Sequence, residues 1–245
     1  MKITVYENKG EMGTAAACKV AEGIRSAIAA RGYANIILTT GASQFEMLNV
    51  LASIPDIDWS CVTMFHLDEY IGLDITHPAS FRKYLTERFI NRIITLKEAH
   101  LINGDTGDPH AECKRVGDLL KKNPIDVACV GIGENGHLAF NDPPADFETE
   151  TPYLVVQLDK KCRQQQMGEG WFSDFDSVPR QAISMSIRQI MKSKRIVVTI
   201  PDLRKAEAVR NTLKQHITPE FPASILRSHH DCSLFTDKLA ASLLA

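Results

Sequence analysis

Apolar runs of strand length alternate with amphipathic stretches along the whole chain. Residues 14–30 carry apolar side chains at helical spacing, and Arg31-Gly32 follows, which predicts a helix that ends there. A second helix is expected over residues 44–54. Short apolar runs predict strands at residues 3–5, 36–38, 61–65, 125–130, 154–158, 182–185, 195–200 and 233–236.

Most of these runs are continuously apolar, which is typical of strands that are covered on both faces. Strands that alternate with helices favour βαβ units and a mostly parallel sheet. We therefore expect a single doubly wound, Rossmann-like α/β domain over residues 1–245. In such sheets ligands bind at the carboxyl ends of the strands, so the residues after each strand are the first candidates for a site.

The composition is that of an ordinary globular protein, with 44% apolar residues, 24% charged residues and a net charge of -2. No basic block predicts a nucleic-acid surface, and no apolar run approaches the ~20 residues that cross a bilayer. The N-terminus lacks the apolar core of a signal peptide, and none of the six cysteines has a partner at metal-ligand spacing. We expect a cytoplasmic protein with reduced thiols, no metal and no nucleic-acid or membrane partner. A homo-oligomer is compatible with this picture.

Small and hydroxyl residues follow the second predicted strand, in the segment TTGASQ. Thr40, Gly41, Ala42 and Ser43 would leave backbone N–H groups accessible at the start of a helix, a geometry that binds phosphate. The alternative is that Ser43 only caps its own helix.

Two adjacent carboxylates follow the third predicted strand, in the segment HLDEY. Neighbouring side chains point in different directions, so Asp68 could face a cleft as a general base while Glu69 acts as its structural partner. The alternative is a solvated turn.

The segment GIGENGHLAFNDP follows the apolar run at 125–130 and holds three glycines around a histidine. Asn135 and Asp142 flank His137 in sequence, and such partners fix the tautomer of a histidine that transfers protons. The pattern G-x-G-x-x-G also marks dinucleotide sites, but it comes late in this chain and lacks the acidic residue that contacts a ribose. A purely structural histidine remains the alternative.

Arg204 and Lys205 open the helix that is expected after residue 200. Cations at a helix N-terminus oppose the helix dipole, and an anionic ligand would relieve that conflict. The alternative is two side chains that extend into water.

Taken together, LTTGAS, FHLDEYIGLDITHPASF, GIGENGHLAFNDP and AISMSIRQI resemble the glucosamine-6-phosphate deaminase family, in order and spacing, over roughly residues 38–190. This family belongs to a wider superfamily of sugar-phosphate isomerases and 6-phosphogluconolactonases. Tyr70 and Phe140-Asn141 are similar to the deaminase branch rather than to the lactonase branch.

The resemblance implies a cofactor-independent hydrolase and isomerase that converts glucosamine 6-phosphate to fructose 6-phosphate and ammonia. His137, oriented by Asn135 and Asp142, would assist ring opening, and Asp68 would move a proton from C2 to C1. The resemblance also implies that the substrate and its phosphate are held by Thr40, Gly41, Ala42, Ser43, Glu69, Gly136 and Lys205.

The chain departs from the family at three positions. Many members have Asp where Asn135 stands and Glu where Asp142 stands. The family's phosphate-clasping Arg is replaced by Gly170, so Arg163 or Arg204 would have to supply the charge. Galactosamine 6-phosphate or a lactone as substrate, and a sugar-phosphate sensor without turnover, therefore remain as alternatives.

Overall fold

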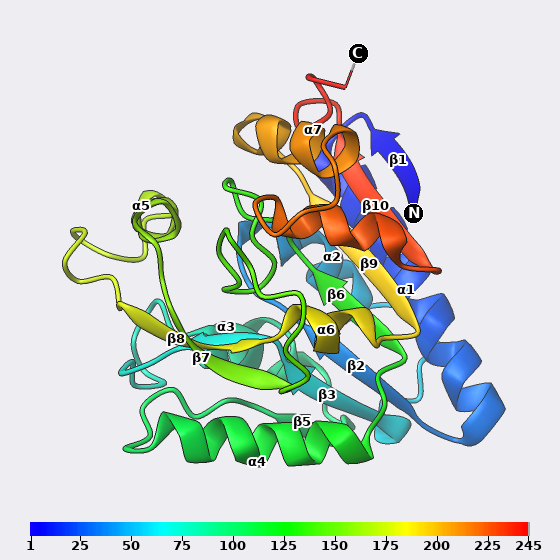
Figure 1. Ribbon diagram of the computed structural model, residues 1–245. Coiled ribbons are helices and arrows are strands. Elements are labelled where there is room, and N and C mark those ends of the chain that lie inside the picture. Colours follow the sequence, from blue (N-terminus) through cyan, green and yellow to red (C-terminus); the bar gives the residue numbers. More distant parts are fainter. Residues whose placement is uncertain (245) are drawn as a thin grey trace.

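A computed structural model describes residues 1–244 and contains one central sheet of seven parallel strands, in the order β1-β10-β9-β6-β2-β3-β5 (Figure 1). Every adjacent pair in this sheet is parallel, so the predicted sheet type is confirmed. Its strands are β1 (Lys2–Tyr6), β2 (Ala34–Leu38), β3 (Val62–His66), β5 (Glu98–His100), β6 (Val127–Val130), β9 (Arg195–Ile200) and β10 (Cys232–Asp237).

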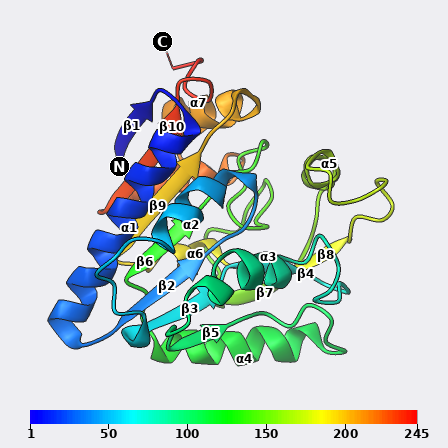
Figure 2. The same cartoon turned by 180° about the vertical axis from the view of Figure 1, so that it is seen from behind.

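Helices cover both faces of the sheet, as a doubly wound fold requires (Figure 2). They are α1 (Lys9–Arg31), α2 (Phe45–Leu51), α3 (Phe81–Arg88), α4 (Pro109–Lys122), α5 (Lys160–Gly168), α6 (Ile187–Met191) and α7 (Ala206–Lys214). Side chains of α1, α2 and α3 join the core on one face, and side chains of α4, α6 and α7 join the core on the other. Among the helices over residues 1–244, none combines the length and apolar character that a bilayer span needs.

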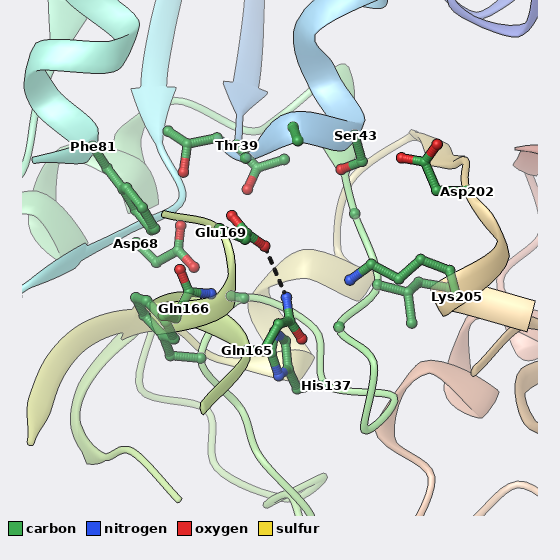
Figure 3. Close-up of a pocket in the computed structure, with 18 of the residues that line it drawn as sticks. Thr39, Ser43, Asp68, Phe81, His137, Gln165, Gln166, Glu169, Asp202 and Lys205 are labelled. Atoms are coloured by element: carbon green, nitrogen blue, oxygen red, sulfur yellow. Dashed lines mark hydrogen bonds between the residues drawn. The ribbon is translucent and has the colours of Figure 1, made fainter. Parts of the chain in front are cut away.

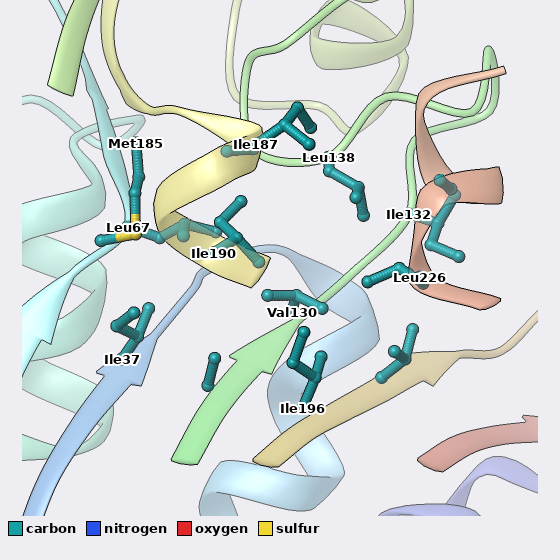
Figure 4. Close-up of a cluster of buried hydrophobic side chains, with 14 of the residues drawn as sticks. Ile37, Leu67, Val130, Ile132, Leu138, Met185, Ile187, Ile190, Ile196 and Leu226 are labelled. Carbon is teal, nitrogen blue, oxygen red and sulfur yellow. The ribbon is translucent and has the colours of Figure 1, made fainter. Parts of the chain in front are cut away.

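The continuous apolar runs have a direct structural reason. All five residues of β2 are buried, and Ile36 and Leu38 pack into the core beside α1 while Ile37 packs into the opposite core. Figure 4 shows this second core, where Ile37 and Val130 of the sheet lie near Ile190 of α6. A strand buried on both faces needs apolar side chains at every position, so the sequence loses the alternation of a half-exposed strand.

Helix α1 is longer than the sequence pattern predicted, because a cap starts it earlier. The Asn8 side chain accepts a hydrogen bond from the Glu11 backbone N–H at 3.0 Å, which fixes the N-terminus. The helix ends at Gly32, whose φ of 80° is the left-handed conformation that glycine adopts without strain, as the sequence predicted.

A second, smaller sheet is antiparallel and lies beside the central one, in the order β4-β8-β7. It consists of β4 (Asp68–Tyr70), β8 (Gln181–Met185) and β7 (Tyr153–Gln157). The apolar runs that were predicted near residues 154 and 182 are strands, but they do not join the parallel sheet. Most of β7 is only half-buried, which is typical of a sheet with one covered face.

The strand order explains where a site can form. The four segments singled out by sequence follow β2, β3, β6 and β9, which are four consecutive strands of the sheet. The chain proceeds outward in one direction from β2 to β3 and in the other from β6 to β9, so β2 and β6 flank the switch point. Ligands of open α/β sheets bind at such a point, beyond the carboxyl ends of the strands.

Candidate active site

A small pocket lies at this switch point, with a cavity volume of about 70 Å³ (Figure 3). All four segments after β2, β3, β6 and β9 contribute to its wall, and α5 contributes from the opposite side. Asp68 and His137 face the pocket near one end, and Ser43, Asp202 and Lys205 lie at the other end. The sequence therefore predicted most of the wall, and the structure brings these segments to one place.

Asp68 is the first residue of β4, where its backbone pairs with Ser184 of β8. Its side chain is buried, and one carboxyl oxygen, Oδ1, has no hydrogen-bond partner in the structure. Burial, together with the adjacent charge of Glu69, raises the pKa of Asp68 to about 8. A buried carboxyl with a free oxygen and a raised pKa is suited to proton transfer at neutral pH.

Glu69 does not line the pocket, and it takes the place of the structural partner that the sequence suggested rather than that of a substrate contact. Its carboxylate points away from the pocket and accepts hydrogen bonds from the backbone N–H groups of Phe81 and Arg82 at 3.1 and 2.7 Å and from the Ser80 hydroxyl at 3.1 Å. Burial outweighs the lowering effect of these hydrogen bonds and raises the pKa of Glu69 to about 7. With so many donors and the Arg82 guanidinium 3.7 Å away, Glu69 is the ionised member of the pair. It anchors the start of α3 behind the site.

His137 is held at the pocket by the glycine-rich segment after β6. Its backbone N–H donates to Asn135 Oδ1 at 3.1 Å, and its backbone carbonyl accepts from the Gly133 N–H at 3.0 Å. A Cβ atom on Gly133 would lie 2.3 Å from the His137 ring, so only glycine fits there. Gly133 therefore makes room for the imidazole.

Asn135 and Asp142, which were predicted as catalytic residues, lie behind His137 and do not line the pocket. Asp142 Oδ1 accepts a hydrogen bond from Asn135 Nδ2 at 2.9 Å and lies 3.1 Å from His137 Nδ1. Burial alone would raise the pKa of Asp142, but the hydrogen bonds and the charge of His137 outweigh it and lower the pKa overall. Both residues are placed to orient the imidazole rather than to touch a substrate.

Thr40, Gly41, Ala42 and Ser43 line the pocket, as the sequence predicted. Gly41 has a φ of 97°, and a 3-10 turn over Ala42–Gln44 precedes α2. Ser43 does not cap α2: its hydroxyl instead accepts a hydrogen bond from Gln44 Nε2 at 3.2 Å. The alternative of a plain helix cap is therefore wrong.

Lys205 also lines the pocket, at the end of a 3-10 turn over Leu203–Lys205 that leads into α7. Its side chain is buried, and burial lowers its pKa, while the charges of Glu169 and Glu134 oppose that shift. The neighbouring Arg204 lies at the rim with 40% of its side chain exposed, and its Nε is 3.6 Å from Glu134 Oε1. A buried ammonium that faces a cavity is the stronger candidate for an anion contact.

Two sequence expectations about this region need correction. Arg163 does not reach the pocket, because its guanidinium donates to the backbone carbonyls of Phe175 and Val178 and lies over the Phe175 ring. Gly136 was assigned to the substrate, but its carbonyl accepts from the Ala223 N–H at 2.9 Å and it lines a neighbouring cavity instead. Arg163 therefore holds the segment over residues 175–178, and the Gly136 carbonyl holds the segment at Ala223.

Sequence reasoning missed the part of the pocket wall that α5 and the residue after it provide. It consists of Gln165, Gln166 and Glu169. Gln165 Oε1 accepts from the Glu134 N–H at 2.8 Å, and its Nε2 donates to Glu169 Oε1 at 3.1 Å. Gln166 Oε1 accepts from the Tyr70 hydroxyl at 2.7 Å. The sequence contains the polar run RQQQMGEG, whose composition is typical of a solvent-exposed helix. In the structure some of these polar side chains instead face the pocket.

Comparisons with known proteins relate nearly the whole chain to one family. The family model described as glucosamine-6-phosphate isomerases/6-phosphogluconolactonase matches residues 7–235. The chain is 36% identical to the glucosamine-6-phosphate deaminase of Thermoanaerobacter sp. (strain X514), over 100% of this chain and 95% of the relative. It is 35% identical to the protein of that name from Lactococcus lactis subsp. lactis (strain IL1403), over 100% of both chains.

Solved structures show the same relationship. A structure described as a monomeric glucosamine-6-phosphate deaminase superposes with a TM-score of 0.90 at 32% identity, covering 99% of this chain and 100% of that one. A 6-phosphogluconolactonase from Shewanella baltica OS155 shares the fold, with a TM-score of 0.77 at 18% identity over 97% of each chain. The chain therefore belongs to the family of glucosamine-6-phosphate isomerases and 6-phosphogluconolactonases.

Proposed function

We propose that this protein is a hexosamine-6-phosphate deaminase that converts glucosamine 6-phosphate and water to fructose 6-phosphate and ammonia. The observation that carries the proposal is the sharing of one pocket by Asp68, His137 and the buried ammonium of Lys205. A base, an acid–base imidazole and a phosphate contact are what an aldose–ketose conversion of a sugar phosphate needs. The names of the related deaminases support the same assignment.

Ring opening is the first step, and we assign it to His137. The imidazole delivers a proton to the ring oxygen while the C1 hydroxyl loses one, which yields the open-chain amino aldehyde. Asp142 lies 3.1 Å from Nδ1 of the ring and stabilises the protonated imidazole, while Asn135 holds Asp142 in place through its amide. Asn135 stands where the resemblance leads us to expect an Asp, and its amide donates the hydrogen bond to Asp142.

Proton transfer from C2 to C1 is the second step, and we assign it to Asp68. The ionised carboxylate removes the C2 proton while the aldehyde oxygen takes up a proton, which gives an enolamine. The carboxylate returns its proton at C1, and the amino group loses a proton, so that an imine forms at C2. Its raised pKa makes the carboxylate a stronger base than an exposed Asp, and its unpartnered Oδ1 is free to accept the proton. The resulting C2 imine takes up water and releases ammonia, and this hydrolysis completes the reaction.

We assign the phosphate to the end of the pocket formed by Thr40, Ser43 and Lys205. Hydroxyl groups and an ammonium donate charge-assisted hydrogen bonds to phosphate oxygens. The cavity of about 70 Å³ is far below the ~300–1,000 Å³ of typical ligand pockets, so side chains of α5 and of the turn after it must move aside to admit the substrate. Gln165 and Glu169, on and just after this helix, are the side chains that close the pocket from that side.

Supporting features complete the proposal. We place the enzyme in the cytoplasm, because all six cysteines are free. We treat residues 1–245 as one functional unit. We propose that one chain acts without a partner subunit, and the similar structure that is described as monomeric supports this. Proton transfer by a carboxylate and an imidazole needs neither a metal nor a nicotinamide.

The test is ammonia release from a panel of sugar phosphates. Glucosamine 6-phosphate should give fructose 6-phosphate and ammonia in equal amounts, and galactosamine 6-phosphate should react more slowly. Hydrolysis of 6-phosphogluconolactone, followed in parallel as acid production, should stay at the uncatalysed rate. The proposal fails if no amino sugar phosphate releases ammonia, or if the lactone is the better substrate.

A further inference from the structure

A buried cluster of three ligand-type side chains lies directly behind the catalytic imidazole. Ligand atoms of His137, Asp142 and Cys162 lie within 4.8 Å of one another. Cys162 comes from the first turn of α5, and its side chain is buried. Neither Asp142 nor Cys162 lines the substrate pocket, so the cluster is separated from that pocket by the His137 ring.

The contacts within the cluster bring its ligand atoms close together. His137 Nδ1 lies 3.1 Å from Asp142 Oδ1. Asp142 is held in place from outside the cluster, because its two oxygens accept from Asn135 Nδ2 at 2.9 Å and from the Asp159 N–H at 3.0 Å. Nδ1 and Oδ1 are therefore close enough to bind one cation in place of the imidazole proton.

The charge around Cys162 also favours a cation. The carboxylate of Asp142 lies within 4.8 Å of its thiol, and the carboxylate of Asp159 accepts a hydrogen bond from its backbone N–H. A metal ion is the group that would compensate this negative surrounding and the loss of the thiol proton.

We propose that His137, Asp142 and Cys162 form an inhibitory binding site for Zn²⁺ or a similar soft divalent cation. An imidazole nitrogen, a carboxylate oxygen and a thiolate sulfur are three typical zinc ligands, and a fourth tetrahedral position stays open for water. Zinc bonds of ~2.0–2.3 Å place such ligand atoms roughly 3.3–3.8 Å apart, so the cluster needs shifts of about 1 Å. The thiol proton passes to solvent when the metal binds.

An access route exists on the side away from the substrate. A cavity of about 500 Å³ is lined by Asn135 and Asp159, both of which hydrogen-bond to Asp142. Its charged lining consists of four acidic and two basic residues, which are Glu134, Asp159, Glu207, Glu220, Lys160 and Lys161. The acidic excess favours the approach of a cation.

The kinetic consequence follows from the position of the site and rests on the proposed function. A metal on Nδ1 fixes the His137 ring and removes its ability to exchange a proton with the Asp142 side. Because the metal lies behind the ring, it does not occupy the substrate pocket. Zinc should therefore lower kcat and leave KM unchanged, and a chelator should restore full activity.

Direct binding is tested with Co²⁺ on the full chain after treatment with EDTA, which needs no substrate. Cobalt bound by a thiolate gives a charge-transfer absorption in the near-ultraviolet, and we expect one cobalt per chain with this signal. Cys162→Ser should abolish the signal and weaken zinc binding by ~100-fold or more, because loss of even an outer partner of a metal ligand costs ~10–100-fold. The matched control is Cys18→Ser, which removes an exposed thiol and should leave the spectrum unchanged.

Each result decides the proposal. It is overturned if the wild-type protein gives no thiolate signal, if the signal survives in folded Cys162→Ser, or if zinc inhibition competes with substrate. Should Cys162→Ser fail to fold, Asp142→Asn in the same binding assay must weaken cobalt binding. If no sugar phosphate is turned over, the proposed function fails, but the cobalt spectra still decide the metal site.

Discussion

The two ends of the pocket are built in different ways. At the catalytic end, Asp68 lies in the segment after β3 and His137 in the segment after β6, and neighbouring backbone holds both in place. At the phosphate end, Lys205 faces residues of α5 and the turn after it, including Glu169, which approach from the opposite side of the pocket. We therefore expect the edge of the sheet to set the reaction, whereas recognition of the phosphate depends on side chains of α5 and the turn after it, which must move aside.

The sharpest test of the catalytic end is Asp68→Asn. The amide keeps the shape of the side chain but cannot accept the C2 proton, so turnover should fall by ~10²–10⁴-fold or more. Substrate binding, measured by calorimetry, should persist, since the phosphate contacts are untouched. Near-normal turnover of this variant would remove Asp68 from the mechanism.

The matched control is Glu69→Gln, one residue further along the chain. Its carboxylate accepts hydrogen bonds from backbone N–H groups and a hydroxyl, so an amide at this position replaces an acceptor by a donor. Bonds to a charged group contribute ~1.5–3 kcal/mol each, so the thermal midpoint should fall clearly. In Asp68→Asn the midpoint should stay or rise, because a buried carboxyl with a raised pKa destabilises the fold between its unfolded and folded pKa values.

The pH profile tests the same end without a mutation. The raised pKa of Asp68, about 8, means that the free enzyme holds this base mostly protonated at neutral pH. A base acts in its deprotonated form, so kcat/KM should fall about tenfold per pH unit as the pH drops below 8. The apparent value belongs to the coupled Asp68–Glu69 pair. An acid limb in the ordinary carboxyl range near ~4 would contradict this reading.

The same contrast explains what the sequence could predict. Residues at strand ends, such as Asp68, His137 and Ser43, were found because a buried strand is an apolar run and its end is a sharp boundary. Strand order could not be predicted from the sequence, because no local pattern indicates that β2 lies beside β6. The separate antiparallel sheet was missed for the same reason.

The sequence-based assignments failed where the direction of a side chain could not be deduced from its position along the chain. Glu69 turned toward the N-terminus of α3, and Arg163 turned toward the carbonyls of residues 175 and 178. Gln165 and Glu169 reach the pocket only because α5 packs across it, a tertiary contact without a periodic signal. The cluster of His137, Asp142 and Cys162 was invisible because two separate segments supply it.

Lys205→Ala tests the phosphate end. A charge-assisted hydrogen bond to phosphate is worth ~1.5–3 kcal/mol, so KM for the phosphorylated sugar should rise by roughly ten- to a hundredfold. Unphosphorylated glucosamine should be a very poor substrate for both proteins, with no difference between them. Arg204→Ala, at the exposed rim, is the matched control and should have a much smaller effect. An equal loss for both sugars would show that Lys205 does not contact the phosphate.

The smallest expected effect comes from Glu169→Gln. This substitution tests whether the turn after α5 strengthens or weakens the binding of the phosphate. The Glu169 carboxylate lines the pocket and helps to keep Lys205 charged, so it lies where it should repel an incoming phosphate dianion. Gln keeps the length of the side chain and the acceptor for Gln165 Nε2. Because a single partly screened charge contributes ~0.4–1 kcal/mol, KM for the phosphorylated sugar should fall by about two- to fivefold, and inorganic phosphate should inhibit more strongly. Glu207→Gln, which removes an exposed carboxylate outside this pocket, should leave both values unchanged. A higher KM in Glu169→Gln would mean that Glu169 binds the substrate, and the α5 side of the pocket would then recognise the sugar instead of repelling its phosphate.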